Sequence, residues 1–159
     1  MIHEIGKELE AKLVEQGCPF KVIDREGTKP TTWRNVIVIE HTTDTIGPTR
    51  SQSLNPKRYW TRNVGAKITI YAQSTASGAL EFEHRRVAER ALDLVLVALR
   101  KVCAERRIGL SNPSGRFVTI PDLERSERQG GAVYELSFSV ERGVADRTWA
   151  GAAAAEATL

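Results

Sequence analysis

The sequence predicts an α+β fold, in which a mainly antiparallel sheet packs against one long helix and an N-terminal helix. Three observations support this prediction. Apolar residues recur at helical spacing through residues 78–107 and form a broad stripe. Residues 59–72 and 132–142 alternate apolar and polar side chains with a period of two, as half-buried strands do. The 159 residues, 41% hydrophobic and 27% charged, suit one globular domain.

The chain is expected to open with an amphipathic helix over residues 2–16. Its apolar residues recur at three- and four-residue spacing: Ile2, Ile5, Leu9 and Leu13. Gly17 and Pro19 are expected to end this helix. A short strand over residues 20–24 follows, and residues 26–30 form a break rich in turn residues.

Two strands are expected next, with a long loop between them. Residues 35–39 carry β-branched side chains on both faces, which suits a central strand. In residues 59–72, one face is apolar: Val64, Ala66, Ile68, Ile70 and Ala72. Residues 42–58 contain Gly47, Pro48 and Pro56 with few apolar residues, so we expect a loop there, and loops of that length are often functional.

The longest expected element is a helix over residues 78–107. Its apolar stripe consists of Val87, Ala88, Ala91, Leu92, Leu94, Val95, Ala98, Leu99 and Val102. Ser77 is a suitable N-cap, and Gly109 is expected to stop the helix. A helix with such a stripe is expected to lie across the sheet and to form much of the core.

The last part of the chain is expected to add two strands and a tail. Residues 112–115 indicate a turn before a short strand over residues 117–120, and residues 121–131 form a polar loop. The final strand places Tyr134, Leu136, Phe138 and Val140 on one face. The predicted order is therefore α-β-β-β-α-β-β, with a single domain over residues 1–144 and a flexible Ala-rich tail over residues 145–159.

Charge points to one candidate interface. The net charge is only +3, but residues 45–80 contain no Asp or Glu, so we expect a local positive potential there. We interpret this stretch as a contact with an acidic surface of another protein or DNA, and an ordinary solvated loop is the alternative. The position of Tyr59 and Trp60 at a strand start favours packing or a subunit interface over stacking with nucleic acid. Ile46 is a further apolar anchor. The predicted interface residues are Arg50, Leu54, Lys57, Arg58, Tyr59, Trp60, Arg62 and Trp149.

Motifs for catalysis, metal binding and cofactor binding are missing from the sequence. The histidines (His3, His41 and His84) form no HExxH pattern or metal-ligand spacing, and we interpret His84 as part of a solvated helix face. No GxSxG, P-loop or GxGxxG occurs, and Cys18 and Cys103 are expected to be reduced, partly buried thiols. We therefore expect no catalytic, cofactor or metal site. No apolar run is long enough for a membrane span and no secretory signal is recognisable, so a cytoplasmic protein is expected.

Several segments together resemble a known family. They are the loop over residues 50–56, the strand over residues 64–72, residues 83–86 leading into the long helix, and the closing strand 134–140 running into residues 142–146. In this order they resemble the tail terminator (tail completion) proteins of long-tailed bacteriophages, of the phage-lambda type. The likeness spans residues 2–147 and lies in element order and loose pattern. The Ala-rich tail after Trp149 is not part of it.

The resemblance implies a structural role in the virion. Proteins of this family form a hexameric ring on the finished tail tube, stop its polymerisation and present the surface that joins the DNA-filled head. The expected partners are further copies of the chain, the tail tube protein and head–tail connector proteins, around a channel that DNA traverses. The family uses no cofactor and is not enzymatic, and its place is the virion tail or neck after assembly in the host cytoplasm.

Three alternatives stay open at this point. A head-completion or stopper protein of the neck also assembles as a ring, and the sequence does not separate it from a tail terminator. A small DNA-binding protein would need more positive charge or a recognition helix. An enzyme with a dispersed site would need catalytic groups that only folding brings together.

Overall fold

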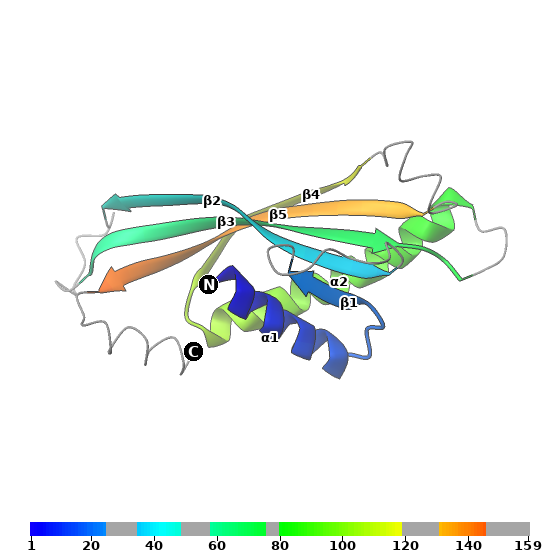
Figure 1. Cartoon of the computed structure of the whole chain (residues 1–159), viewed down its shortest axis with the longest axis horizontal. Helices are drawn as coiled ribbons and strands as arrows, with labels where there is room; N and C mark the ends of the chain where they lie inside the picture. Colours follow the sequence, from blue (N-terminus) through cyan, green and yellow to red (C-terminus); the bar gives the residue numbers. More distant parts are fainter. Residues whose placement is uncertain (25–34, 49–57, 76–79, 119–130, 146–159) are drawn as a thin grey trace.

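The computed structural model describes residues 1–24, 35–48, 58–75, 80–118 and 131–145 (Figure 1). Its elements are α1 (Ile2–Glu15), β1 (Lys21–Asp24), β2 (Val36–Pro48), β3 (Arg58–Ala72), α2 (Glu81–Glu105), β4 (Gly109–Val118) and β5 (Ala132–Ala145). This order confirms the predicted α-β-β-β-α-β-β arrangement.

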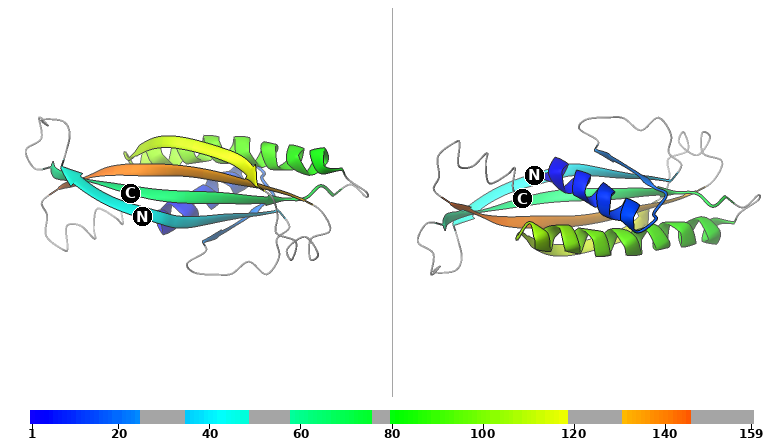
Figure 2. Two further views of the ribbon diagram at one scale, coloured as in Figure 1. Left: turned by 90° about the horizontal axis from the view of Figure 1, so that it is seen from above. Right: turned by 90° about the horizontal axis from the view of Figure 1, so that it is seen from below.

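One twisted sheet forms the frame of the molecule, with the strands in the order β1-β2-β3-β5-β4. The β1–β2 pair is parallel, and the other three pairs are antiparallel. Both helices lie on the same face of the sheet (Figures 1 and 2). Helix α1 contacts β1 and β2, whereas α2 contacts β3, β5 and β4. The α+β prediction with a mainly antiparallel sheet is confirmed.

The main core lies between this sheet and the helices. Leu9 of α1, Ile39 of β2, Ile68 of β3 and Leu99 of α2 are fully buried in one cluster. On β3 the side chains of one face are buried from Val64 to Ala72, whereas Lys67 and Tyr71 on the other face are partly exposed and Thr69 is buried. The predicted inner face of β3 is confirmed, and so are Leu136, Phe138 and Val140 of β5.

Helix α2 is shorter and differently capped than predicted. It begins after Leu80, which provides no side-chain cap, and it ends at Glu105 rather than near Gly109. Ser77 lies outside the described residues. The inward face is narrower than the predicted stripe, because Leu92 and Leu94 are only partly buried. The fully inward positions are largely small side chains, which allow the helix axis to approach the sheet closely: Ala88, Ala91, Val95, Ala98, Leu99 and Val102.

Both helices end in the same backbone motif. In α1, Gly17 has a φ of 73°, and Cys18 N–H donates to the Leu13 carbonyl at 2.9 Å. In α2, Arg107 has a φ of 55°, and Ile108 N–H donates to the Cys103 carbonyl at 3.1 Å. Both are Schellman ends, in which one left-handed residue satisfies the last carbonyls. Gly17 adopts the left-handed conformation at little cost, whereas the side chain of Arg107 makes that conformation less favourable.

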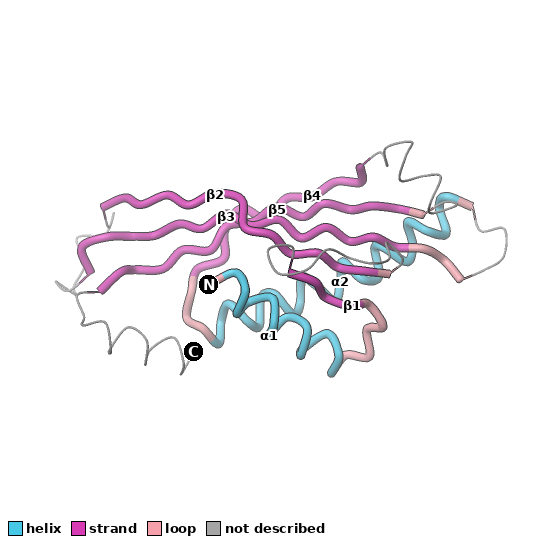
Figure 3. Tube along the Cα trace, in the orientation of Figure 1, coloured by secondary structure: helices cyan, strands magenta, loops and turns pink. Residues whose placement is uncertain are grey.

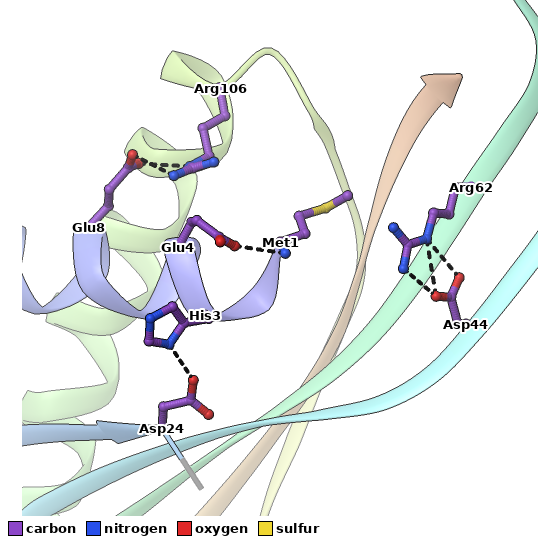
Figure 4. A network of polar contacts seen from close by, with 8 residues as sticks. All are labelled: Met1, His3, Glu4, Glu8, Asp24, Asp44, Arg62 and Arg106. Atoms are coloured by element: carbon purple, nitrogen blue, oxygen red, sulfur yellow. Dashed lines mark hydrogen bonds and ion pairs between the residues drawn. The ribbon is translucent and has the colours of Figure 1, made fainter. Parts of the chain in front are cut away.

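Polar contacts fasten α1 to its neighbours (Figure 4). Arg106 directly follows α2, and its side chain is buried. Its guanidinium donates from Nε and a terminal nitrogen to the two Glu8 carboxylate oxygens at 3.0 and 2.7 Å. Lys12 Nζ donates to Glu105 Oε1 at 2.9 Å. At the other side of α1, His3 Nδ1 lies 2.7 Å from Asp24 Oδ2 of β1. These pairs orient the short helix on the sheet in addition to its apolar face.

Three strands are longer than predicted. Strand β5 continues to Ala145 rather than ending at residue 142. Strand β2 continues to Pro48, so residues 42–48 are strand and not loop. Strand β4 runs without a break from Gly109 to Val118, and the predicted turn at residues 112–115 is a bulge between Ser111 and Ser114. Pro113 is tolerated there because β4 is an edge strand, where a missing N–H leaves no sheet partner unsatisfied.

Candidate assembly interface

Three strands run on beyond the helices at one end of the sheet (Figures 1 and 3). We call this extension the β arm. It comprises residues 41–48 of β2, 58–63 of β3 and 141–145 of β5. Residues 45–48 pair with residues 60–63, and residues 41–44 at the base of the arm pair with residues 64–66. The remaining parts of the same strands, residues 36–39, 64–72 and 132–140, form the helix-covered half of the sheet.

Burial differs sharply between the two regions. Residues 36–39 of β2 are all buried, whereas residues 41–46 of the same strand are all exposed. Ile46 is 69% exposed and Trp60 is 53% exposed, although both belong to strands. Isolated ribbons of two strands are marginally stable in water, and an uncovered extension gains little from apolar burial. The β arm therefore presents apolar side chains without a core of its own among the described residues.

The exposed apolar residues lie on the face that the helices cover further along. Pro48 is opposite Trp60, and Ile46 is opposite Arg62. Opposite residues share a face, and alternate residues along a strand share it too. Ile46 and Trp60 are thus on the same face as Val64 and Ile68, which are buried under the helices. The apolar face of the sheet therefore extends beyond the part that the two helices cover.

A cross-strand ion pair ties β2 to β3 within the β arm (Figure 4). Arg62 Nε donates to both carboxylate oxygens of Asp44 at 3.1 Å, and a terminal nitrogen also donates to Oδ2. Hydrogen bonding from Arg62 holds the pKa of the Asp44 carboxyl below its ordinary value of 3.8. Both side chains are about one-third exposed, so solvent screens the pair and its main effect is to align the strands.

A second basic residue of the acid-free stretch is also paired inside the chain. Lys67 Nζ lies 2.9 Å from Glu40 Oε1 and 3.6 Å from Glu135 Oε1, on the face away from the helices. The hydrogen bond to Glu40 raises the pKa of the Lys67 ammonium above its ordinary 10.5. The expectation of a bare positive potential over residues 45–80 is therefore wrong where the structure describes them, because neighbouring strands bring carboxylates that the linear stretch lacks.

The structure places only part of the predicted interface. Arg62 and Trp60 lie together on the β arm, and Arg58 and Tyr59 begin β3, where the structure describes their backbone alone. Four predicted residues lie outside the described residues: Arg50, Leu54, Lys57 and Trp149.

Sequence reasoning missed two parts of the arm. Asp44 was placed in a loop, and the end of β5 was not considered as an interface. The run Thr42-Thr43-Asp44-Thr45-Ile46 is rich in β-branched residues, a signal for a strand that the nearby Gly47 and Pro48 outweighed.

His84 and the two cysteines, which the sequence offered as candidate reactive side chains, lie in the interior of the structure. His84 is buried, which corrects its predicted exposure, and its Nδ1 accepts the Ser74 N–H at 2.9 Å. This hydrogen bond links α2 to the backbone just after β3. Cys18 and Cys103 are free and buried, and burial raises the pKa of the Cys103 thiol to about 11, so this thiol is poorly reactive at neutral pH.

The described residues contain no group of three or more His, Cys, Asp or Glu side chains arranged to hold a metal ion. None of the described helices combines the length and apolar character that crossing a membrane requires. In comparisons with known proteins, no family model matches the chain, and a search of curated proteins found no match.

Proposed function

We propose that this protein is a structural subunit that assembles with copies of itself into a ring, as a tail terminator at the end of a phage tail tube. The observation that carries the assembly part is the β arm, where Trp60 and Ile46 are exposed on a face that is buried elsewhere. The resemblance in element order carries the tail-terminator part. The protein would then lie in the virion tail or neck, with the tail tube and connector proteins as neighbours.

The β arm carries large apolar side chains that no helix covers among the described residues. Large apolar and aromatic side chains are the usual anchors of protein interfaces, because burying them removes much apolar area from water at low entropic cost. Trp60 and Ile46 sit on adjacent, regularly paired strands, which hold them in place before a partner arrives. Because these side chains are already ordered, association costs less entropy than it would for an ordinary solvated loop.

The nature of the contact differs from the one that charge suggested. Arg62 is engaged by Asp44 in the same chain, so its charge is already balanced locally. We therefore assign the attraction between copies mainly to Trp60 and Ile46, with the Arg62–Asp44 pair keeping the two strands in register.

The test is the mass of the protein in solution together with negative-stain imaging. We expect a particle several times the 17.6 kDa of one chain, with a central hole. The double variant Trp60→Ser/Ile46→Ser should remain folded and become monomeric. Val97→Ser is the matched control, because Val97 is 48% exposed but lies on α2, and it should assemble normally. A wild-type chain that stays monomeric at all concentrations would refute the proposal.

Another neck component, such as a head-completion or stopper protein, remains the alternative from the same class. It would assemble through the same arm but bind portal-bearing heads rather than tail-tube ends. Binding of purified rings to tail tubes and to heads separates the two. A DNA-binding role would instead show as duplex affinity with a salt slope of about −0.9 per phosphate neutralised.

A further inference from the structure

Within the described part of the chain, the β arm has two strand edges without a paired strand. Strand β1 pairs only with residues 36–39 of β2, so no strand among the described residues pairs with the outer edge of residues 43–48. On the opposite side, β4 pairs with β5 up to Glu141, and no described strand pairs with the outer edge of residues 142–145. Open edges present rows of backbone N–H and C=O groups that can pair with another chain.

A bulge at residues 41–43 and Pro48 flank the open β2 edge, but between them it lacks the usual protection against such pairing. Residues 43–47 contain no Lys, Arg or Pro, and their register with β3 is regular. The outermost strands of the sheet differ: β1 has only four residues, and β4 carries a bulge at Pro113. Short strands, prolines and bulges are the devices that block unwanted edge pairing. Both outer strands therefore carry such a device, whereas residues 43–47 of the arm do not.

The two open edges have matching directions. Strand β2 is antiparallel to β3, and β3 is antiparallel to β5, so β2 and β5 run the same way. A copy placed beside the arm by a rotation about a ring axis would bring its β2 next to β5 of the first copy, in parallel. Repeating that step uses one β2 edge and one β5 edge per copy, and closure of the ring leaves neither open.

We propose that neighbouring copies join edge to edge at the β arm, with β5 (residues 142–145) of one copy pairing in parallel with the open part of β2 (residues 43–47) of the next. This inference rests on the proposed ring assembly and specifies its contact. The arms then form one continuous, closed sheet. A two-fold pairing of β2 with β2 would leave both β5 edges open and would stop at a dimer.

Cross-linking between two labelled copies tests the arrangement. One copy carries Thr45→Cys on β2, and the other carries Glu141→Cys beside the open part of β5. Both positions are exposed and share a face, since each is opposite Asn63. The copies are mixed, assembled and treated with a short flexible bis-maleimide. Cys18 and Cys103 are buried, and the unmodified chain with the same reagent measures their background.

The expected result is a covalent dimer in the mixture and little in either variant alone. Rings that form but give no mixed cross-link, or that cross-link Thr45→Cys to itself, would overturn the edge pairing and leave the ring proposal standing. Absence of any oligomer would overturn both.

Hydrogen exchange supplies a second readout. Amides in residues 43–47 should exchange about tenfold or more slowly in the assembled protein than in the monomeric Trp60→Ser/Ile46→Ser variant, because half of them gain a strand partner. Unchanged exchange in these residues within an intact ring would also overturn the edge pairing.

Discussion

The helix-covered half of the sheet and the β arm are built from the same three strands, yet they obey different constraints. In the covered half, Ile39 and Ile68 are completely buried, and the sheet face that they share is lined by apolar side chains. On the same face of the arm, a salt-bridged pair stands beside Ile46 and Trp60. The covered half has the apolar composition of a protein core, whereas the arm combines exposed apolar side chains with polar ones, as the interface that we propose requires.

The bulge between His41 and Thr43 marks the boundary between the two regions. It faces Gly65, whose hydrogen lies where a side chain would meet the hydroxyls of Thr42 and Thr43. Bulges bend a strand and increase its twist. The strands thus change direction where they leave the helices.

The largest effect should come from removing a core side chain in the covered half. Leu99→Ala deletes a fully buried side chain of α2 and should lower the free energy of unfolding by about 2–5 kcal/mol, the usual range for such truncations. Urea denaturation measures it. Val97→Ala, two residues earlier on the exposed side of α2, should change stability by less than about 0.5 kcal/mol. Equal losses would show that the helix layer is wrongly oriented.

The boundary itself gives a smaller effect. Gly65→Ala would place its Cβ against the Thr42 and Thr43 hydroxyls, and relieving this contact should cost about 1–3 kcal/mol of stability. Gly47→Ala in the β arm has nothing within 4 Å of the new Cβ and should be close to neutral. Thermal melting of both variants makes the comparison. A neutral Gly65→Ala would mean that the junction is looser than its packing suggests.

The helix layer can also be stabilised without touching the arm. Arg107→Gly should add about 1 kcal/mol to the unfolding free energy, because a side chain no longer occupies a left-handed position. Gly17→Ala, at the equivalent position of α1, should destabilise by a similar amount. Neither change should alter the concentration at which the protein assembles. A shift in that concentration would show that folding and assembly are not separated as the two regions imply.

The smallest effect concerns the ion pair of the arm. The pKa of Asp44 lies below 3.8 in the folded chain, so the contact with Arg62 is present above that pH and is lost as the pH falls through the lowered pKa. Arg62→Gln should return the Asp44 pKa toward 3.8. Carboxyl NMR titration of the two proteins measures the shift. An unshifted Asp44 in the wild-type protein would mean that the pair is not formed.

Much of the covered half was predictable because its pattern is local. The alternation in β3, the apolar spacing of α1 and the stripe of α2 each predict an element from neighbouring residues alone. The bounds of β2 and β4 were not predictable in this way. Gly47, Pro48 and Pro113 indicate turns in a local reading, but a partner strand can hold such residues in a strand end or bulge.

The sequence by itself determined the number, type and order of the elements, since side-chain periodicity is a property of consecutive residues. Only the tertiary structure decided what the basic stretch meets. Asp44 and Arg62 are 18 residues apart, and the pairing of β2 with β3 makes them neighbours. The same holds for the open edges, because whether a backbone group has a partner depends on which distant strand lies beside it, and no local pattern records that.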